Sequence, residues 1–255
     1  LLSDRGVPYR NSPRNNNTVY QDLANPQFAE WFLENVVDMT SNAEDQRLID
    51  GTFADQVKRK DYPFYHMTKQ RNAEFIAAQM KHVNDTRMRM RKTFAPNPKY
   101  IANCLTPGVG PGRSTGVEVL PYTDAACYEH FISHENLFSS GAGANGTLIP
   151  TRFQTSIDAI ETFTNASKNV FIKGWPGPVE SAAKGWTAQS GLTTPTTWVG
   201  KQQALTDWLV PSLAAYLIIA TNMTYWSYNW GWEGDKGVYP CCKNECAGPC
   251  NWYPQ

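Results

Sequence analysis

Apolar residues recur along the chain at two kinds of spacing, one typical of helices and the other typical of strands. Aromatic and aliphatic side chains repeat at helical spacing over residues 28–37, directly after Asn25-Pro26, a typical helix start. The same spacing predicts helices over residues 69–91, 153–164 and 201–216. Shorter apolar runs predict strands over residues 19–22, 48–54, 99–103, 125–131, 169–173 and 217–226.

This alternation indicates an α/β fold with parallel strands joined by helical crossovers. In a TIM-type (β/α) barrel, loops at the carboxyl ends of the strands build the site, and such loops here are rich in Asp, Asn, Gly and Trp. Six predicted strands fall short of the usual eight, so either two strands are missed or the barrel is incomplete. We expect an N-terminal arm at residues 1–17, a barrel domain at 18–238 and a Cys-rich tail at 239–255.

Charge and hydropathy exclude two classes of partner. The 23 basic residues balance 23 acidic ones, which argues against nucleic-acid binding through excess positive charge. The best candidate for a membrane span, residues 208–226, contains Pro211 and Asn222, which hydrocarbon disfavours, so we expect no span. The chain also opens without the basic start and apolar run of a secretory signal. A local basic run is predicted to form the solvated end of a helix and comprises Arg87, Arg89, Arg91 and Lys92.

Two features nevertheless predict a secreted protein. Asn-X-Ser/Thr glycosylation sequons begin at Asn16, Asn84, Asn145, Asn165 and Asn222, although an Asn-rich chain also produces some by chance. Four cysteines crowd the tail, at Cys241, Cys242, Cys246 and Cys250. We favour disulfides over a zinc site there, because no His lies near and zinc-ribbon spacing is absent. Cys104 and Cys127 would then form the remaining pair, and the connectivity stays open.

The candidate chemistry lies at the ends of predicted strands. Asp55 follows the strand at 48–54, and Asn103 ends the strand at 99–103. By alternation, Cys127, Glu129 and Phe131 share one face of the next strand. Asp55 and Glu129 would both point into the mouth of a barrel, and two carboxylates flanking a cleft are what glycoside hydrolysis needs. The alternative is that both are ordinary solvated surface residues.

The string DGTFAD at residues 50–55 resembles the DGxFxD strand of glycoside hydrolases with (β/α)8 barrels. These include the endo-polygalactosaminidase-like and related glycosyl-hydrolase-like families. The order of later motifs is similar too: a strand ending in Asn103, a strand running from Asp124 to Glu129, and Lys173 within VFIKGWPGP. The aromatic stretch at 213–232 looks like the last barrel strand of such families, and Asp22 with Asn25-Pro26 resembles their early strand-to-helix junction. The resemblance covers residues 18–240.

The resemblance implies that Asp55 is the nucleophile or base and Glu129 the general acid, and that Asp50, Asn103 and Lys173 line or brace the site. Two departures weaken this expectation. The first two barrel strands are missing, and open sheet edges invite pairing with another chain. Asn222 begins a sequon inside a strand predicted to be buried, so either that strand starts later or the sequon is unused.

Other motifs leave alternatives open. Trp226, Tyr228, Trp230 and Trp232 alternate, so they share a strand face that is either a sugar-stacking platform or core packing, and Trp175 and Trp186 flank a loop that could add to the same cleft. His130 and His134 have metal-ligand spacing on a helix, but the predicted strand breaks that geometry, so we expect no metal and no cofactor. The Gly-rich loop at 106–116 lacks a phosphate-loop Lys and is better explained as a lid.

These observations lead to two hypotheses. The first is a secreted glycoside hydrolase-like protein that acts on or binds polysaccharide through a two-carboxylate site. The second is a catalytically inactive barrel that serves as a structural subunit of an extracellular glycoprotein assembly, as a homo-oligomer or filament.

Overall fold

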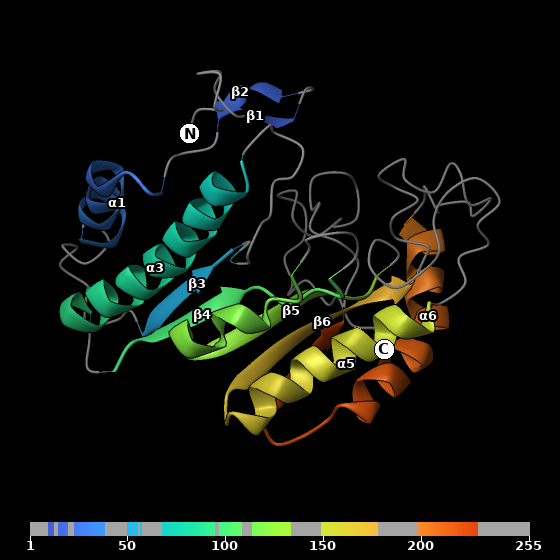
Figure 1. The fold of residues 1–255 in the computed structure, drawn as a ribbon. Helices are drawn as coiled ribbons and strands as arrows, with labels where there is room; N and C mark the ends of the chain where they lie inside the picture. Colours follow the sequence, from blue (N-terminus) through green and yellow to red (C-terminus); the bar gives the residue numbers. More distant parts are fainter. Residues whose placement is uncertain are drawn as a thin grey trace, which may run out of the picture. The chain divides into compact units, whose positions relative to one another are not determined.

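The structure is a computed structural model, and it describes residues 10–12, 15–19, 23–38, 50–55, 57, 68–94, 97–108, 114–133, 149–177 and 198–228. The chain divides into two compact units, the first formed by Leu1–Cys104 and Gly110–Ala125, the second by Leu105–Val109 and Ala126–Gln255. The described strands form a parallel five-stranded sheet in the order β3-β4-β5-β6-β7 and a two-stranded sheet (Figure 1). The predicted α/β class is therefore confirmed.

The first unit contains a short antiparallel pair, three helical segments around a parallel strand pair, and a 3-10 helix. Its elements are β1 (Arg10–Ser12), β2 (Asn15–Val19), α1 (Pro26–Phe32), η1 (Leu33–Asp38), β3 (Gly51–Ala54), α3 (Lys69–Thr93), β4 (Lys99–Asn103) and η3 (Val117–Tyr122). Side-chain caps explain where its two α-helices begin. Asn25 Oδ1 accepts a hydrogen bond from the Gln27 amide at 2.9 Å, and Thr68 Oγ1 accepts one from the Arg71 amide at 3.1 Å.

The long helix α3 is buried along one of its own faces. Phe75, Val83, Thr86 and Met90 are its buried residues, and their spacing places them along one stripe of the helix. On the neighbouring stripe, the His82 ring meets Phe32 of α1 edge-on, with centroids 4.7 Å apart. These contacts explain why a helix rich in charged residues is nevertheless fixed in place.

Close approach of two strands explains the glycine that begins β3. β3 and β4 are parallel, with Gly51 paired to Lys99, and the Lys99 amide donates to the Asp50 carbonyl at 2.8 Å. A Cβ atom on Gly51 would lie 2.2 Å from the Lys99 carbonyl oxygen, so no larger residue fits without moving backbone. This contact sets the register that brings the ends of β3 and β4 together.

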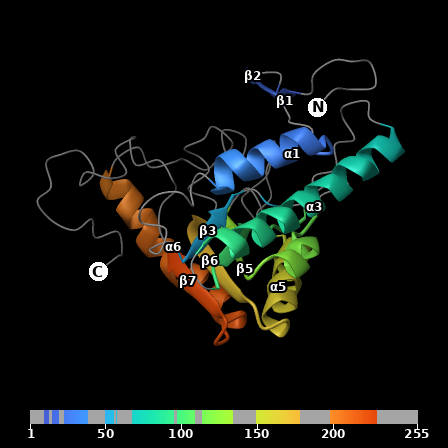
Figure 2. The same cartoon turned by 90° about the vertical axis from the view of Figure 1, so that its left-hand side faces the viewer.

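The second unit repeats a strand–helix pattern. Its elements are β5 (Ala125–Ser133), of which Ala125 belongs to the first unit, α5 (Pro150–Asn165), β6 (Asn169–Gly177), α6 (Trp198–Ile218) and β7 (Thr224–Tyr228). β6 and β7 are parallel and lie side by side, with α6 packed against both (Figure 1, Figure 2). α5 also contacts β6 and, through Ser156, Tyr128 of β5.

Buried aromatic side chains with paired hydroxyls form the core of the second unit. The Tyr128 hydroxyl lies 2.6 Å from Ser156 Oγ on α5, and the Tyr228 hydroxyl donates to the Leu205 carbonyl on α6 at 2.8 Å. Trp226 stacks between Tyr216 and Tyr228, with ring centroids 5.7 Å from each. β5 and β7 are thus each joined to a helix, α5 and α6 respectively, by a hydrogen bond as well as by apolar contact.

Two predicted boundaries were wrong. The strand expected over residues 217–226 begins only at Thr224, because α6 continues through Ile218 and a turn follows. The predicted arm at 1–17 contains β1 and most of β2, which pair with each other. The strand expected over 19–22 is β2, which ends at Val19 and belongs to the antiparallel sheet, while residues 20–22 lie outside the described ranges.

Candidate functional site

The structure brings together two of the predicted site residues, Asp55 and Asn103. Asp55 directly follows β3 and Asn103 ends β4, and the strand register pairs their neighbours Ala54 and Ala102. The side-chain Nδ2 of Asn103 donates to Asp55 Oδ1 at 2.6 Å, and the backbone carbonyl of Asn103 accepts from the Val57 amide at 3.0 Å. The side chain and the backbone of one buried asparagine therefore both hold the segment that carries Asp55.

This pair has the features of a positioned acid. Asn103 is only 7% exposed, so its amide is fixed by the surrounding core, whereas Asp55 is exposed at the carboxyl end of a parallel strand. Carboxyl ends of parallel strands are where α/β folds place their reactive groups. An oriented carboxylate in that position can serve as a nucleophile, a base or a ligand for a polar substrate group.

Asp50 lies elsewhere. It precedes β3, so the four residues Gly51–Ala54 separate it from Asp55 along an extended strand. Its exposed side chain thus lies at the amino end of β3 rather than at the Asp55–Asn103 pair. The DGTFAD string holds two acids at opposite ends of one strand, and only the second is near Asn103.

Glu129 lies in β5 of the second unit and is held by its neighbour. His130 Nε2 and Glu129 Oε1 are 3.1 Å apart, and the two side chains are 21% and 14% exposed. Tyr128 and Phe131 both contact α5, through Ser156 and Phe153, although three residues separate them. The shared face of Cys127, Glu129 and Phe131 stays a prediction.

Lys173 lies in β6 and is 6% exposed. Gly174 faces α6, since a Cβ there would meet Ser212, so alternation directs Lys173 to the face of β6 that α6 does not cover. Its register partner in β7 is Ser227. The bracing role that the resemblance implies for Lys173 stays a prediction.

The predicted aromatic platform lies in different places. Tyr228 is 2% exposed beneath α6 and stacks on Trp226, so core packing accounts for both residues and leaves Tyr228 little surface for a ligand. Trp175 lies in β6, and Trp186, Trp230 and Trp232 lie outside the described residues. On the opposite strand face, Phe171 stacks on Tyr225 with centroids 5.2 Å apart, and Tyr225 is 49% exposed. Sequence reasoning missed this pair because it considered Lys173 in β6 and the alternating residues that begin at Trp226 in β7, and did not consider Phe171 or Tyr225.

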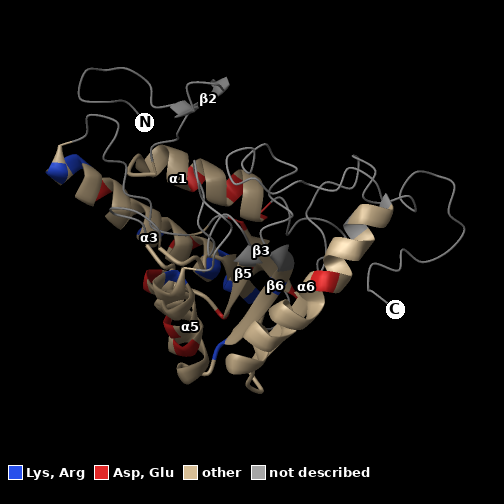
Figure 3. Cartoon of the chain, turned by 90° about the vertical axis from the view of Figure 1, so that its right-hand side faces the viewer, with Lys and Arg blue, Asp and Glu red and all other residues tan. Residues whose placement is uncertain are grey.

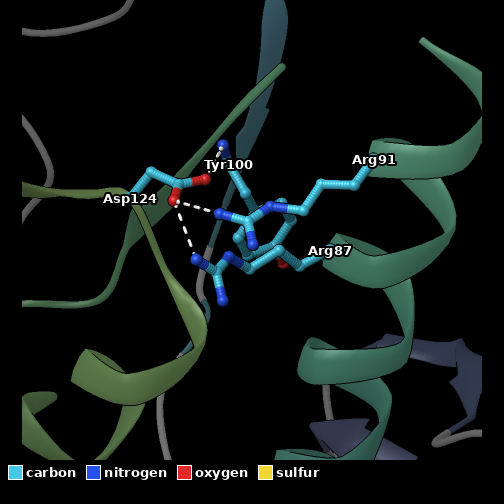
Figure 4. A network of polar contacts seen from close by, with 4 residues as sticks. All are labelled: Arg87, Arg91, Tyr100 and Asp124. Atoms are coloured by element: carbon cyan, nitrogen blue, oxygen red, sulfur yellow. Dashed lines mark hydrogen bonds and ion pairs between the residues drawn. The ribbon is translucent and has the colours of Figure 1, made fainter. Parts of the chain in front are cut away.

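Asp124 forms a separate cluster that anchors the first unit (Figure 4). Its Oδ1 accepts hydrogen bonds from Arg87 at 2.9 Å and Arg91 at 3.0 Å, and its Oδ2 accepts from the Tyr100 amide at 2.9 Å. Burial by itself raises the pKa of Asp124, but these hydrogen bonds and the two arginine charges outweigh it, so the pKa is held below its usual value. Every oxygen of this carboxylate is engaged by the fold, which indicates a structural role.

The basic run was expected to be the solvated end of a helix. That prediction was wrong for Arg87 and Arg89, whose side chains are 16% and 28% exposed, whereas Arg91 and Lys92 are exposed in the last turn of α3. Arg87 and Arg91 bind Asp124, while Arg89 forms ion pairs with Glu30 and, at 3.4 Å between Nε and Oδ1, with Asp38. The arginines thus tie α3 to α1, η1 and the start of β5 instead of facing a partner.

The modification sites are only partly described. Asn165 and Asn222 are exposed, Asn84 is half-buried in α3, Asn16 lies in β2, and Asn145 lies outside the described residues. Asn222 lies in the turn before β7, which resolves the conflict of a sequon within a buried strand in favour of a later strand start. Cys104 is buried and Cys127 half-buried, and no disulfide joins them, so the predicted pairing of these two is not formed in the structure. The four tail cysteines and His134 lie outside the described residues, so the tail disulfides stay a prediction.

Within the described ranges, no cluster of three or more His, Cys, Asp or Glu side chains has the arrangement to hold a metal ion. None of the described helices combines the length and the hydropathy of a membrane span.

A search against protein-family models and a search against curated proteins both find no match to this chain. The site therefore has to be judged from its own geometry.

Proposed function

We propose that the chain is a secreted glycoside hydrolase-like protein that acts on or binds polysaccharide, with Asp55 and Glu129 as its two carboxylates. The observation that carries the proposal is the 2.6 Å hydrogen bond from buried Asn103 to exposed Asp55 at the ends of two parallel strands. This bond holds the Asp55 carboxylate in one orientation at the carboxyl ends of β3 and β4. The motif order around DGTFAD adds support from the sequence.

The order of the sheet strands supports a (β/α)-barrel winding for the fold. Each strand of the five-stranded sheet neighbours the strand that precedes or follows it in sequence. That order is the one barrels use, whereas doubly wound sheets reverse direction at a switch point. Closure into a full TIM barrel and the disulfide-rich tail belong to this proposal.

In the proposed chemistry, Glu129 protonates the glycosidic oxygen as the bond to the anomeric carbon breaks, and Asp55 attacks that carbon or removes a proton from an attacking water. Glu129 suits the acid role because its side chain is largely shielded from solvent and contacts His130. Asp55 suits the nucleophile or base role because it is exposed and oriented. Lys173 and the Phe171–Tyr225 pair would contact the sugar or brace the acids.

The test is hydrolysis of a panel of plant, algal and microbial polysaccharides, followed by released reducing ends. Asp55→Asn and Glu129→Gln should each lower the rate by at least about a hundredfold while circular dichroism and the melting temperature stay close to the parent values. Asp50→Asn is the matched control, because it alters an exposed acid at the other end of the same strand. Full activity in either catalytic variant would remove that residue from the mechanism.

A second function is favoured by the surface of α6. Only Lys201 and Asp207 among its 21 residues are charged, and Figure 3 shows α6 almost entirely in the colour of uncharged residues. Val199 and Val210, eleven positions apart on one stripe, are 73% and 71% exposed. A catalytically inactive subunit of an extracellular assembly would use such a helix as an interface. Sedimentation of the purified full chain tests this, since a stable interface buries more than about 1,000 Å², and Val210→Lys should dissociate it.

A further inference from the structure

Two exposed glycosylation sequons lie at neighbouring turns of the second unit. Asn165 is the last residue of α5, four residues before β6 begins, and Ser167 completes its sequon. Asn222 lies in the turn between α6 and β7, and Thr224 completes its sequon as the first residue of β7. Both asparagine side chains are exposed, as N-linked glycans require.

The strand pairing places both turns at one edge of the sheet. β6 and β7 are parallel, with Val170 paired to Thr224, and the Val170 amide donates to the Met223 carbonyl at 2.8 Å. The asparagine of each sequon therefore lies just before its strand, at the amino-terminal edge of the sheet. Glycans there would leave the carboxyl ends of β6 and β7 uncovered.

The sequon at Asn84 differs from these two. Asn84 lies in the middle of α3 and is half-buried, between the buried residues Val83 and Thr86. The Thr86 hydroxyl donates to the His82 carbonyl at 2.8 Å, within the helix. A branched glycan on Asn84 would have to leave from the flank of a packed helix, so the folded protein tolerates it less well.

The end of α6 next to Asn222 exposes apolar surface. Leu217 and Ile218 are 62% and 63% exposed, although they belong to the last turn of a helix with few charges. Ile218 precedes Asn222 by four residues, so the chain keeps the two within about 14 Å of each other. A bulky, hydrated glycan on Asn222 can therefore reach over these two side chains and shield them from water.

We propose that Asn165 and Asn222 carry N-linked glycans along the amino-terminal edge of β6 and β7, and that the Asn222 glycan covers Leu217 and Ile218. The proposal rests on the secreted character in the proposed function, because these glycans are added in the secretory pathway. It assigns the glycans to the edge opposite the strand ends where the candidate site lies.

Measuring which asparagines carry a glycan tests the first part of the proposal, that Asn165 and Asn222 are glycosylated. The full chain is expressed behind an added signal sequence in a eukaryotic secretory host, and the folded protein is treated with a peptide N-glycosidase in heavy-oxygen water. Peptides with Asn165 and Asn222 should each convert to the labelled aspartate, while Asn84 stays unmodified. An unmodified Asn165 or Asn222 in the folded protein, or a fully occupied Asn84, would overturn the assignment.

Removing single glycans tests the second part of the proposal, that the Asn222 glycan covers Leu217 and Ile218. Asn222→Gln should raise binding of a hydrophobic dye and self-association severalfold over the parent, and Asn165→Gln should not. If Asn222→Gln fails to fold, enzymatic deglycosylation of the folded Asn165→Gln protein exposes the same surface. Leu217→Ser with Ile218→Lys should abolish the increase. Equal dye binding with and without the Asn222 glycan would contradict shielding.

The outcomes are independent of catalysis. The added signal sequence makes occupancy a property of the fold and not of the natural route of the protein. A chain glycosylated at both positions but without hydrolytic activity would support this inference and count against the enzyme. Hydrolysis with both sequons empty would do the reverse.

Discussion

Asn103 donates its side-chain amide to Asp55 at 2.6 Å, and this contact joins the carboxyl ends of two paired strands. We expect Asn103→Leu to lower the free energy of unfolding by about 1 kcal/mol, since one hydrogen bond to an exposed carboxylate is lost. Urea denaturation at pH 7 measures this change.

A matched variant separates loss of the bond from electrostatic repulsion. Asn103→Asp places a second carboxylate within hydrogen-bond distance of Asp55, and like charges so close destabilise the folded state. This variant should be less stable than Asn103→Leu at pH 7 and should recover as the pH falls below about 4, where carboxylates take up protons. Identical pH profiles for the two variants would show that the 2.6 Å contact does not form.

The Asp124 cluster predicts a second stability effect. Asp124→Asn should cost about 2–3 kcal/mol at pH 7, because Arg87 and Arg91 lose the charge that they share in a largely buried site. Arg87→Met should cost more than Arg91→Met, since the Arg87 side chain is 16% exposed and that of Arg91 is 39% exposed. Chemical denaturation of the three variants gives the order.

The sign of the pH dependence follows from the lowered pKa of Asp124. A carboxyl group with a pKa lower in the folded than in the unfolded state stabilises the fold above its unfolded pKa, about 3.9. That stability is lost as the pH falls through the folded pKa. The difference between parent and Asp124→Asn should therefore shrink in acid, and a constant difference from pH 7 to pH 2 would contradict the cluster.

His82 should make the first unit less stable in mild acid. Burial lowers its pKa, with Lys81 acting in the same direction and Asp85 opposing. The folded state therefore favours the neutral ring against Phe32, and this stability is complete above the unfolded pKa of about 6.5 and declines as the pH falls below it.

His82→Phe removes the titrating group and retains an aromatic ring beside Phe32. Its melting temperature should change less between pH 7.5 and pH 5.5 than that of the parent protein. Asp124 titrates at lower pH and does not interfere in this range. Parallel melting curves for the two proteins over this range would show that His82 is solvated.

Two glycines should respond differently to the same added methyl group. A Cβ on Gly174 would lie 2.6 Å from Ser212 Oγ and 2.7 Å from Trp226 Nε1, so Gly174→Ala should cost about 1–3 kcal/mol. Adding Ser212→Gly should restore part of this loss, because one of the two obstructing atoms is removed. A Cβ on Gly51 meets the Lys99 backbone, so Gly51→Ala has no comparable rescue. Thermal melts of these four proteins distinguish the two cases.

The positions of the helices and of most strands along the chain were predictable because their signals are local. Asn25-Pro26 and the spacing of Phe75 and Val83 mark helices whether or not the rest of the chain is present. The start of β7 was missed because residues 213–220 are apolar on every side, and periodicity cannot separate such a run into helix and strand.

The candidate site was predictable only where it depends on adjacent strand ends. Asp55 and Asn103 meet because both directly follow paired residues of a parallel ladder. Alternation correctly placed Trp226 and Tyr228 on one face, yet it does not say that α6 covers that face. The contacts of Asp124 with Arg87 and Arg91 span 37 and 33 positions and leave no local pattern.

The position of Asp124 also limits how the chain can be shortened. A fragment that stops after β4 would retain α3 and its arginines but omit the anion that neutralises Arg87 and Arg91. Such a piece would carry two uncompensated cations against the Tyr100 backbone and lose the acceptor for that amide. Any recombinant half-molecule that contains α3 must therefore run at least through residue 124 to retain this anion.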